Sequence, residues 1–350
     1  MSAGTGMSPA ARLLDPSDAR WISYVASRDE ATPFHHPAWM RLLAAAYGFD
    51  PFVYAILDES GRVRAGLPLM KVVTPLRGAK FVSLPFSDCC EPLADDPDLI
   101  ERLRSSLTAW RKRSGISQIE IRSGWAPDGD VRRGERYVYH KLRLAPDLEA
   151  IAKRVDHSHL RYAKIAEEKG IAVHWSRSLA DLRSFYAMHV ETRRGHGVPV
   201  QPWRYFRCFH EHILDSGLGS LALARRGERC VGGLVLLHWK GTLIVKYGAS
   251  RRDSLRSRPN DLLYWTAIRW AFERGYKVFD IGRSDVADAG LARFKRDWGA
   301  EETFLDYSIL SDAPVVRRPS AALRAMKSVI RRSPPWVCRL LGEAFYRYVG

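Results

Sequence analysis

The chain has 350 residues, of which 46% are hydrophobic and 27% charged, and its formal net charge is +16. This composition is that of a soluble globular protein of roughly two domains, and it excludes a low-complexity or fibrous chain. The large positive charge predicts attraction to phosphates in nucleic acid, nucleotides or anionic lipid, without choosing among them.

Local patterns exclude three further classes. The best apolar run, 231–239, is far shorter than the roughly 20 residues of a membrane-spanning helix. The N-terminus has neither the basic start nor the apolar core of a signal peptide, so we expect a cytoplasmic protein. The five cysteines are scattered without a C-x-x-C pair, which indicates neither a disulfide framework nor a zinc site.

In chain order, the sequence predicts the same succession of helices and strands in each half. The first half predicts helices at 18–26 and 40–47, strands at 52–57, 63–73 and 79–84, a helix at 98–112 and a strand at 118–122. The second half predicts helices at 179–193 and 204–214, strands at 220–225, 230–238 and 242–249, a helix at 261–274 and a strand at 277–281. Two hairpins, each followed by a helix-to-strand crossover, predict two α+β domains with mixed sheets.

Two further segments lie outside this repeat. Residues 147–169 are charged and predict one ordinary linker helix. Residues 314–350 carry eight arginines and lysines against one acid. Two apolar stripes run along this tail, Leu323, Met326, Val329 and Ile330 in one and Trp336, Leu340, Leu341 and Phe345 in the other. Such a basic amphipathic tail either lies on an anionic membrane or packs on the core, and both interpretations stay open.

The clearest chemical signal lies at 259–299. An amphipathic helix ends at Gly275 and leads to a short buried strand that ends in Asp280 and Arg283. The chain then reads Gly-Leu-Ala-Arg-Phe-Lys-Arg-Asp-Trp-Gly over 290–299, which sets Lys295 between Phe294 and Trp298. A cation held against apolar groups is what acyl transfer needs to stabilise an oxyanion.

This segment resembles the second half of the FemAB/FemX family of peptidyltransferases, whose domains are built like GNAT acyltransferases, and the arm-less, BioF2-like branch in particular. The shared pattern is Trp, helix, Gly, strand, Asp-x-Gly, then Gly-Leu-x-x-Phe-Lys-x-x-aromatic-Gly. The resemblance implies two tandem GNAT-like (acyl-CoA N-acyltransferase-type) domains. We place them at 15–146 and 147–312, followed by a basic helical tail at 313–350.

By this resemblance, Phe294 and Lys295 match the family's Phe-Lys pair beside the transferred acyl group. The alternative is an ordinary amphipathic helix that leaves Lys295 in solvent and Phe294 in the core. Asp280 is a candidate to accept the amine proton, or it caps the turn. Arg283 departs from the family's small or apolar residue and suits a phosphate or carboxylate partner.

The glycine-rich loop by which GNAT enzymes bind the pyrophosphate of acyl-CoA is not found after 246–250. Four arginines stand there instead and are candidates for binding donor phosphates: Arg251, Arg252, Arg256 and Arg258. The missing loop argues against a conventional acetyl-CoA enzyme. Two acyl donors stay open, aminoacyl-tRNA and acyl-CoA. We expect no permanently bound cofactor and no metal.

Other candidates for substrate binding are Tyr247, Tyr264, Asp88, Trp39 and Lys71, for which packing or surface charge is the alternative. The leading hypothesis is a FemAB-like acyl- or aminoacyltransferase that acts on an amine or hydroxyl of a cell-envelope precursor, peptidoglycan or exopolysaccharide. It would work in the cytoplasm, alone or in peripheral contact with the inner face of the membrane, with tRNA as one candidate partner. A conventional GNAT acetyltransferase and a non-enzymatic basic module that binds nucleic acid or membrane are the alternatives.

Overall fold

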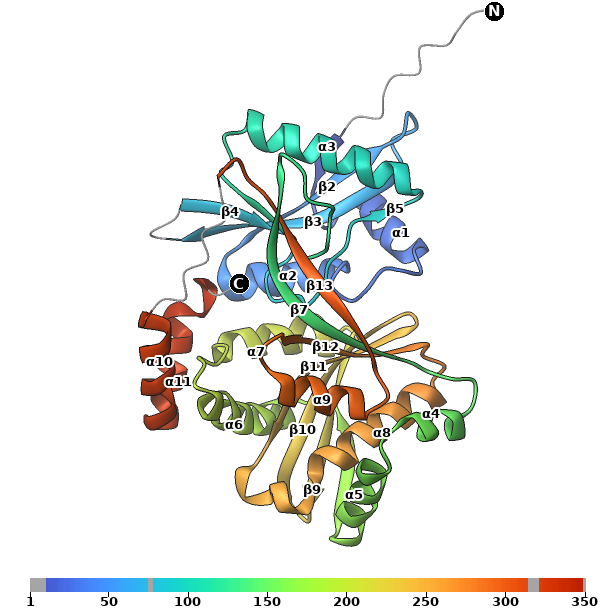
Figure 1. The fold of residues 1–350 in the computed structure, drawn as a ribbon, viewed down its shortest axis with the longest axis vertical. Coiled ribbons are helices and arrows are strands. Elements are labelled where there is room, and N and C mark those ends of the chain that lie inside the picture. The colour runs from blue at the N-terminus through green and yellow to red at the C-terminus, as the bar shows by residue number, and fades with distance from the viewer. Residues whose placement is uncertain (1–10, 75–77, 314–320, 349–350) are drawn as a thin grey trace, which may run out of the picture. The chain divides into compact units, whose positions relative to one another are not determined.

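The computed structural model describes residues 11–74, 78–313 and 321–348, and these divide into two compact units (Figure 1). Unit 1 comprises Met1–Glu135 and Asp306–Val316, and unit 2 comprises Arg136–Leu305 and Arg317–Gly350. These bounds differ from the predicted 15–146, 147–312 and 313–350. The first boundary falls earlier, residues 306–316 return to unit 1, and the tail belongs to unit 2. The difference arises because two long strands that the sequence did not predict cross the boundary.

Unit 1 is built on a mixed sheet. Its elements are β1 (Ala11–Leu14), α1 (Ala19–Ser27), α2 (Pro37–Tyr47), β2 (Asp50–Leu57), β3 (Val63–Thr74), β4 (Gly78–Val82), β5 (Leu93–Ala94), α3 (Pro97–Arg113) and β6 (Ile119–Ile121). The strands lie in the order β1-β2-β3-β4-β6, and β4 and β6 are parallel. The last strand of this sheet is the end of β13 (Glu301–Leu310), whose Ser308–Leu310 pair with β6.

Unit 2 repeats the plan. Two helices come first, α4 (Leu148–Arg154) and α5 (His157–Glu168), then β8 (Ile171–Ser176), α6 (Leu179–His196), α7 (Trp203–Phe209), a π-helical turn (His210–Leu214), β9 (Gly219–Arg226), β10 (Arg229–Trp239), β11 (Thr242–Ser250), a 3₁₀ turn (Arg252–Ser257), α8 (Pro259–Glu273), β12 (Val278–Asp285) and α9 (Ala289–Asp297). The strands lie in the order β8-β9-β10-β11-β12, with β11 and β12 parallel. β12 pairs on its other side with β7 (Val131–Arg143).

The two halves therefore share one strand order, and each sheet is completed by a strand from the other half of the sequence. This confirms the predicted α+β fold with mixed sheets. The predicted single linker helix is wrong, because Val155 adopts an extended conformation and Asp156 begins α5 as its N-cap. Such a break ends one helix and starts the next within two residues.

Local sequence explains where α6, the central helix of unit 2, begins and ends. The Ser178 side chain accepts a hydrogen bond from the Asp181 N–H at the N-cap. Gly197 ends the helix with φ +70, a left-handed conformation that glycine adopts without steric cost. Between these ends α6 buries Phe185, Tyr186 and Met188, and the helix contacts β10 and β11 of the sheet.

The basic tail forms α10 (Ala321–Arg332) and α11 (Pro335–Phe345), and both helices contact α6 (Figure 1). Cys338 is fully buried, and its Sγ lies 3.4 Å from the Val198 carbonyl oxygen. Gly342 is buried against Val200, so closely that a Cβ at this position would overlap the Val200 carbonyl oxygen. One face of α11 thus packs on the core. Among the described residues, no helix is both long and apolar enough to cross a membrane.

We expect Gly342→Ala to loosen α11, because a methyl group has no room beside Val200. The cost should be about 1–3 kcal/mol, as for other overpacked sites. Limited proteolysis and hydrogen exchange of 335–348 would report the loss. Gly195→Ala is the matched control, since Gly195 is exposed on α6 with nothing near the added methyl. If α11 stays equally protected in both variants, Gly342 does not set this contact.

Candidate active site

The candidate site lies in unit 2, where two parallel strands diverge. β11 and β12 pair only from Thr242 with Val278 to Ile244 with Asp280. Both strands then continue, β11 to Ser250 and β12 to Asp285, while pairing with β10 and β7 on their outer sides. Diverging strands leave facing backbone groups that an extended substrate can bind in the manner of an added strand.

A β-bulge marks this point on each strand. The β12–β7 register shifts between Asp280 and Gly282, and the β10–β11 register shifts between Val235 and Leu236, opposite Tyr247 and Val245. Gly282 has φ +71, which an L-residue with a side chain rarely adopts. Bulges of this kind bend a strand and change the direction of its side chains and carbonyls.

Lys295 of α9 binds the β12 bulge directly. Its side chain is only 5% exposed, and its Nζ donates hydrogen bonds to the carbonyl oxygens of Gly282 (2.9 Å) and Arg283 (2.8 Å). This burial excludes the alternative in which Lys295 stands in solvent. A buried cation is costly unless it is hydrogen-bonded, so the two carbonyls both stabilise the ammonium and fix its position.

Asp280 also belongs to the bulge. Its carboxylate is buried and accepts hydrogen bonds from the Tyr139 hydroxyl (2.5 Å) and the Gly282 N–H (2.7 Å). Both carboxylate oxygens are thus engaged in shaping the bulge. Arg283 is half-buried, and its guanidinium carbon lies 3.9 Å from the centre of the Tyr137 ring. Lys295, Asp280 and Arg283 are the predicted site residues that the structure brings together.

The sequence did not point to the polar groups that β7 and β13 add. His140 is fully buried, and its Nε2 lies 3.2 Å from the Glu302 carboxylate. Burial, and secondarily the positive charge of Lys295, lower the pKa of His140, so this imidazole is neutral and does not repel the ammonium. The Nδ1 of His140 has no hydrogen-bond partner among the described residues. The same holds for the buried hydroxyl of Ser284 on β12. The aromatic and β-branched run Tyr137-Val138-Tyr139 was the available signal for β7.

Phe294 and Tyr264 form part of an aromatic cluster instead. Their rings meet edge to face at 5.2 Å, and the His159 ring stacks on Trp298 at 4.7 Å. His159 Nδ1 lies 2.5 Å from the Asp261 carboxylate, which gives this histidine a packing role. Desolvation by burial raises the pKa of Tyr264. Within the described ranges no group of His, Cys, Asp and Glu side chains is arranged as metal ligands.

Tyr247 extends from β11 toward α6 and α7. Its hydroxyl lies 2.9 Å from that of Tyr205, and its ring centre is 5.2 Å from that of His189. His189 is buried with its Nε2 3.0 Å from the Gln201 side-chain oxygen. Burial, followed by the charge of Arg193, lowers the pKa of His189 to about 3. These partners of Tyr247 were not predicted, because the sequence does not show which faces of two separate helices meet.

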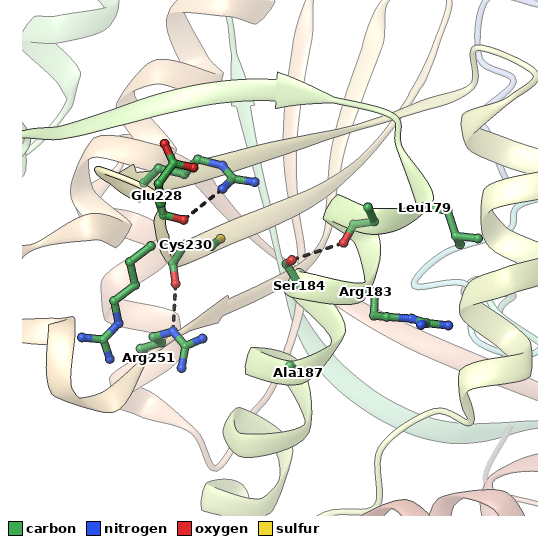
Figure 2. Close-up of a pocket in the computed structure, with 10 residues that line it drawn as sticks. Leu179, Arg183, Ser184, Ala187, Glu228, Cys230 and Arg251 are labelled. Atoms are coloured by element: carbon green, nitrogen blue, oxygen red, sulfur yellow. Dashed lines mark hydrogen bonds between the residues drawn. The ribbon is translucent and has the colours of Figure 1, made fainter.

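The four predicted phosphate-binding arginines share one segment but point to different partners. Arg251 donates from Nε to the Cys230 carbonyl oxygen (2.8 Å) and lines an open groove of about 730 Å³ (Figure 2). Arg258 stacks over the Tyr162 ring at 3.8 Å. Arg252 and Arg256 are exposed on the 3₁₀ turn that precedes α8. They do not form one clamp in this structure.

The remaining candidates lie in unit 1. Trp39 is fully buried and packs edge to face on Phe34 at 5.0 Å, so none of its surface is available to a ligand. Lys71 is exposed on β3, paired in register with Asp50 and Phe81. Neither position forms a site with the other.

Asp88 follows a strained turn at the end of β4. Leu84 and Phe86 have φ of 60° and 64°, a region that residues with side chains rarely occupy. Arg122 holds the turn by donating from Nη1 to the Ser87 carbonyl oxygen (2.8 Å), and the Tyr307 hydroxyl donates to the Asp88 carbonyl oxygen (2.7 Å). Backbone strain that is held by several contacts is a feature of functional sites.

Comparison with known proteins agrees with this fold. Residues 155–296 match the family model described as an acetyltransferase (GNAT) domain. A crystal structure of FemX has a TM-score of 0.66 at 12% identity, covering 85% of this chain and 96% of that one. L-PGS from Bacillus licheniformis has a TM-score of 0.55 at 12% identity, covering 91% and 99%. A tandem GNAT protein from the clavulanic acid biosynthesis pathway has a TM-score of 0.51 at 11% identity, covering 88% and 100%.

Residues 155–296, which lie within unit 2 and make up less than half of the chain, are thus similar to a GNAT acetyltransferase domain. The predicted similarity to FemX and to tandem GNAT proteins is confirmed, and so is the predicted enzyme class, acyltransferase. At these identities the likeness to solved structures concerns the fold. No curated protein sequence matches the chain significantly.

Buried histidines make unit 2 sensitive to acid. Burial lowers the pKa of His189 to about 3 and of His238 to about 4, against 6.5 in an unfolded chain. Below pH 6.5 the unfolded chain therefore binds protons that the folded unit does not. The free energy of unfolding should fall by about 1.4 kcal/mol per pH unit for each histidine between pH 6.5 and 4.

Denaturant titrations at several pH values check this expectation. His189→Gln should remove one histidine's share of the slope below pH 6.5. His196→Gln, at an exposed position of the same helix, is the control and should leave the slope unchanged. Equal slopes for His189→Gln and the parent protein would show that His189 takes up its proton without unfolding.

Proposed function

We propose that this protein transfers an acyl or aminoacyl group to an amine or hydroxyl of a cell-envelope or exopolysaccharide precursor, at the divergence of β11 and β12. The observation that carries this proposal is the ammonium of Lys295, buried and fixed on the β12 bulge beside that divergence. The similarity to FemX and to a putative lysylphosphatidylglycerol synthetase C-terminal domain from Agrobacterium fabrum supports an envelope substrate.

The proposed chemistry follows from this geometry. The acceptor nitrogen or oxygen attacks the donor carbonyl, and the carbonyl oxygen gains negative charge in the tetrahedral intermediate. A preorganised cation in a water-poor site stabilises such an oxyanion more than water does. Lys295 supplies that cation, held in place by its hydrogen bonds to the Gly282 and Arg283 carbonyl oxygens. The collapse of the intermediate then breaks the bond to the donor's leaving group, which departs with the proton that the acceptor nitrogen or oxygen loses.

We assign the other residues of the bulge to positioning. Asp280, bound to Tyr139 and Gly282, holds the bulge in shape. That shape sets the two carbonyls that orient Lys295, so the carboxylate acts through the ammonium. Arg283 and Tyr247 are proposed to contact substrate, Arg283 through a carboxylate or phosphate group. Phe294 of α9 packs edge to face on Tyr264 of α8, and we assign this pair to holding α9 in place.

The donor is proposed to be aminoacyl-tRNA, with acyl-CoA as the alternative that the matched domain favours. The segment before α8 carries arginines in place of a glycine-rich loop, and Arg252 and Arg256 are exposed there. Exposed arginines suit a phosphate backbone, which is contacted by charge rather than enclosed by backbone N–H groups. We further propose that the reaction takes place on the cytoplasmic side of the membrane.

Replacing Lys295 should separate catalysis from binding. We expect Lys295→Met to lower kcat by about 10²–10³, the loss typical of one oxyanion-stabilising group, because the neutral chain keeps the volume and removes the charge. Lys295→Arg keeps the charge and should lose less. The assay is transfer of labelled acetyl or aminoacyl groups to a purified muropeptide precursor.

Arg293→Ala, an exposed position of the same helix, is the control and should retain activity. Thermal unfolding of each variant separates lost catalysis from lost folding. Full activity of a folded Lys295→Met protein would remove Lys295 from the mechanism.

The donor can be identified by binding titrations of acetyl-CoA, aminoacyl-tRNA and uncharged tRNA at two salt concentrations. We expect tRNA binding that prefers the charged form and weakens with salt, and that Arg252→Gln/Arg256→Gln weakens further. Salt-resistant binding of acetyl-CoA alone would instead assign acyl-CoA as the donor. Equal binding of charged and uncharged tRNA would contradict an aminoacyl donor.

A further inference from the structure

The tail helices expose large apolar side chains while they are held on unit 2. Four of them are more than half exposed, and we call them the tail face: Val329, Trp336, Leu340 and Phe345. Burying such side chains is favourable, so a cluster of them on an ordered helix indicates a surface that is covered in function.

This exposure does not come from a detached helix. The opposite side of α11 buries Cys338 and Gly342 against 198–200, and Tyr346 is buried just after the helix. Glu343, the one acid of the tail, accepts a hydrogen bond from the Trp203 N–H (3.2 Å). These contacts hold α11 on unit 2, while Trp336 and Leu340, about one turn apart on its other side, are exposed.

Basic side chains are exposed on the same two helices and just after them. Those of Lys327, Arg331, Arg332, Arg339 and Arg347 are all exposed. Trp and Phe at the boundary of an apolar surface, combined with Lys and Arg, are the composition of helices that lie in the headgroup region of anionic bilayers. The short length of α10 and α11 agrees with helices that lie on a membrane rather than cross it.

We propose that the tail face docks unit 2 on an anionic phospholipid bilayer, with Trp336 and Leu340, about one turn apart on α11, inserted at the headgroup level. Charge complementarity selects this occupant. A second copy of the chain would bring two identical basic surfaces together in a symmetric contact, and their like charges would oppose it. An anionic bilayer neutralises the same charges and buries the apolar side chains in one step.

This inference is independent of the proposed acyl transfer. Binding to lipid depends on the tail face, and the proposed chemistry depends on Lys295, so either can fail without the other. If both hold, docking raises the local concentration of membrane-linked acceptors around unit 2, which favours the reaction with lipid-linked over freely dissolved precursors.

The test is co-sedimentation of the full-length protein with two sets of vesicles, phosphatidylcholine alone and phosphatidylcholine with 30% phosphatidylglycerol. We expect binding to the anionic vesicles, weakened at 0.5 M salt, and at least tenfold weaker binding to the neutral ones. Trp336→Ser/Leu340→Ser/Phe345→Ser should weaken anionic binding at least tenfold. The matched control, Leu13→Ser/Val73→Ser/Leu255→Ser, removes three comparably exposed apolar side chains elsewhere and should bind like the parent protein.

Two further measurements keep the proposal open to refutation. Arg332→Gln/Arg347→Gln should weaken anionic binding roughly fivefold for each charge removed while apolar area is unchanged. Sedimentation velocity checks for self-association. Equal binding to both kinds of vesicle, parent-like binding by the triple variant, or a dimer that only the triple variant dissolves would each overturn the proposal. Thermal unfolding confirms that every variant is folded.

Discussion

The site depends on one contact, the ammonium of Lys295 bound to two consecutive carbonyls of β12. In a regular strand successive carbonyls point in opposite directions, so a single cation does not reach both. The bulge and the positive φ of Gly282 bring them to the same Nζ. The ammonium in turn donates hydrogen bonds to two carbonyl oxygens at the divergence of the sheet. The shape of the β12 bulge and the position of the Lys295 ammonium therefore depend on each other.

This arrangement explains why the two halves share a fold yet differ in chemistry. Both sheets contain a parallel pair at the same place in the strand order, β4 with β6 and β11 with β12. After its pair, unit 2 has a glycine bulge bound by a cation. Unit 1 has a turn with two strained residues, held by the buried guanidinium of Arg122. The duplicated scaffold thus supplies two equivalent positions, and the local residues decide what each can bind.

The sequence predicted the parts of this fold whose signal is local. Three such parts were predictable: the hairpins, the helix from 261 and its end at Gly275. Hydrophobic periodicity and a glycine that ends a helix are signals that extend over only a few residues. β7 and β13 were not predictable, because Arg132, Arg133 and Glu135 interrupt the apolar pattern at the start of β7 and 301–304 are exposed in β13. Their identity as strands depends on partners far away in the chain.

The same limit explains the errors at the site. Lys295, Asp280 and Arg283 follow each other closely in sequence, so their proximity could be inferred from one motif. His140 and Glu302, 3.2 Å apart, come from strands that the sequence did not reveal. The four arginines illustrate the opposite case, because neighbours in sequence point to different partners. A short segment determines which residues are close in the sequence. Tertiary packing determines which of their side chains meet at one site.

The positive charges of the chain consequently act in two ways, which differ in how strongly dissolved salt weakens them. Lys295 is buried and compensated by fixed carbonyls within 3 Å, so dissolved ions screen it little. Arg331, Arg332 and Arg339 of α10 and α11 are exposed, and attraction between them and a distant anionic surface falls once the Debye length shortens to a few ångströms. Ionic strength should therefore act on docking and donor encounter far more than on the chemical step. The net charge of +16 therefore does not predict one effect, because each charge acts according to whether it is buried or exposed.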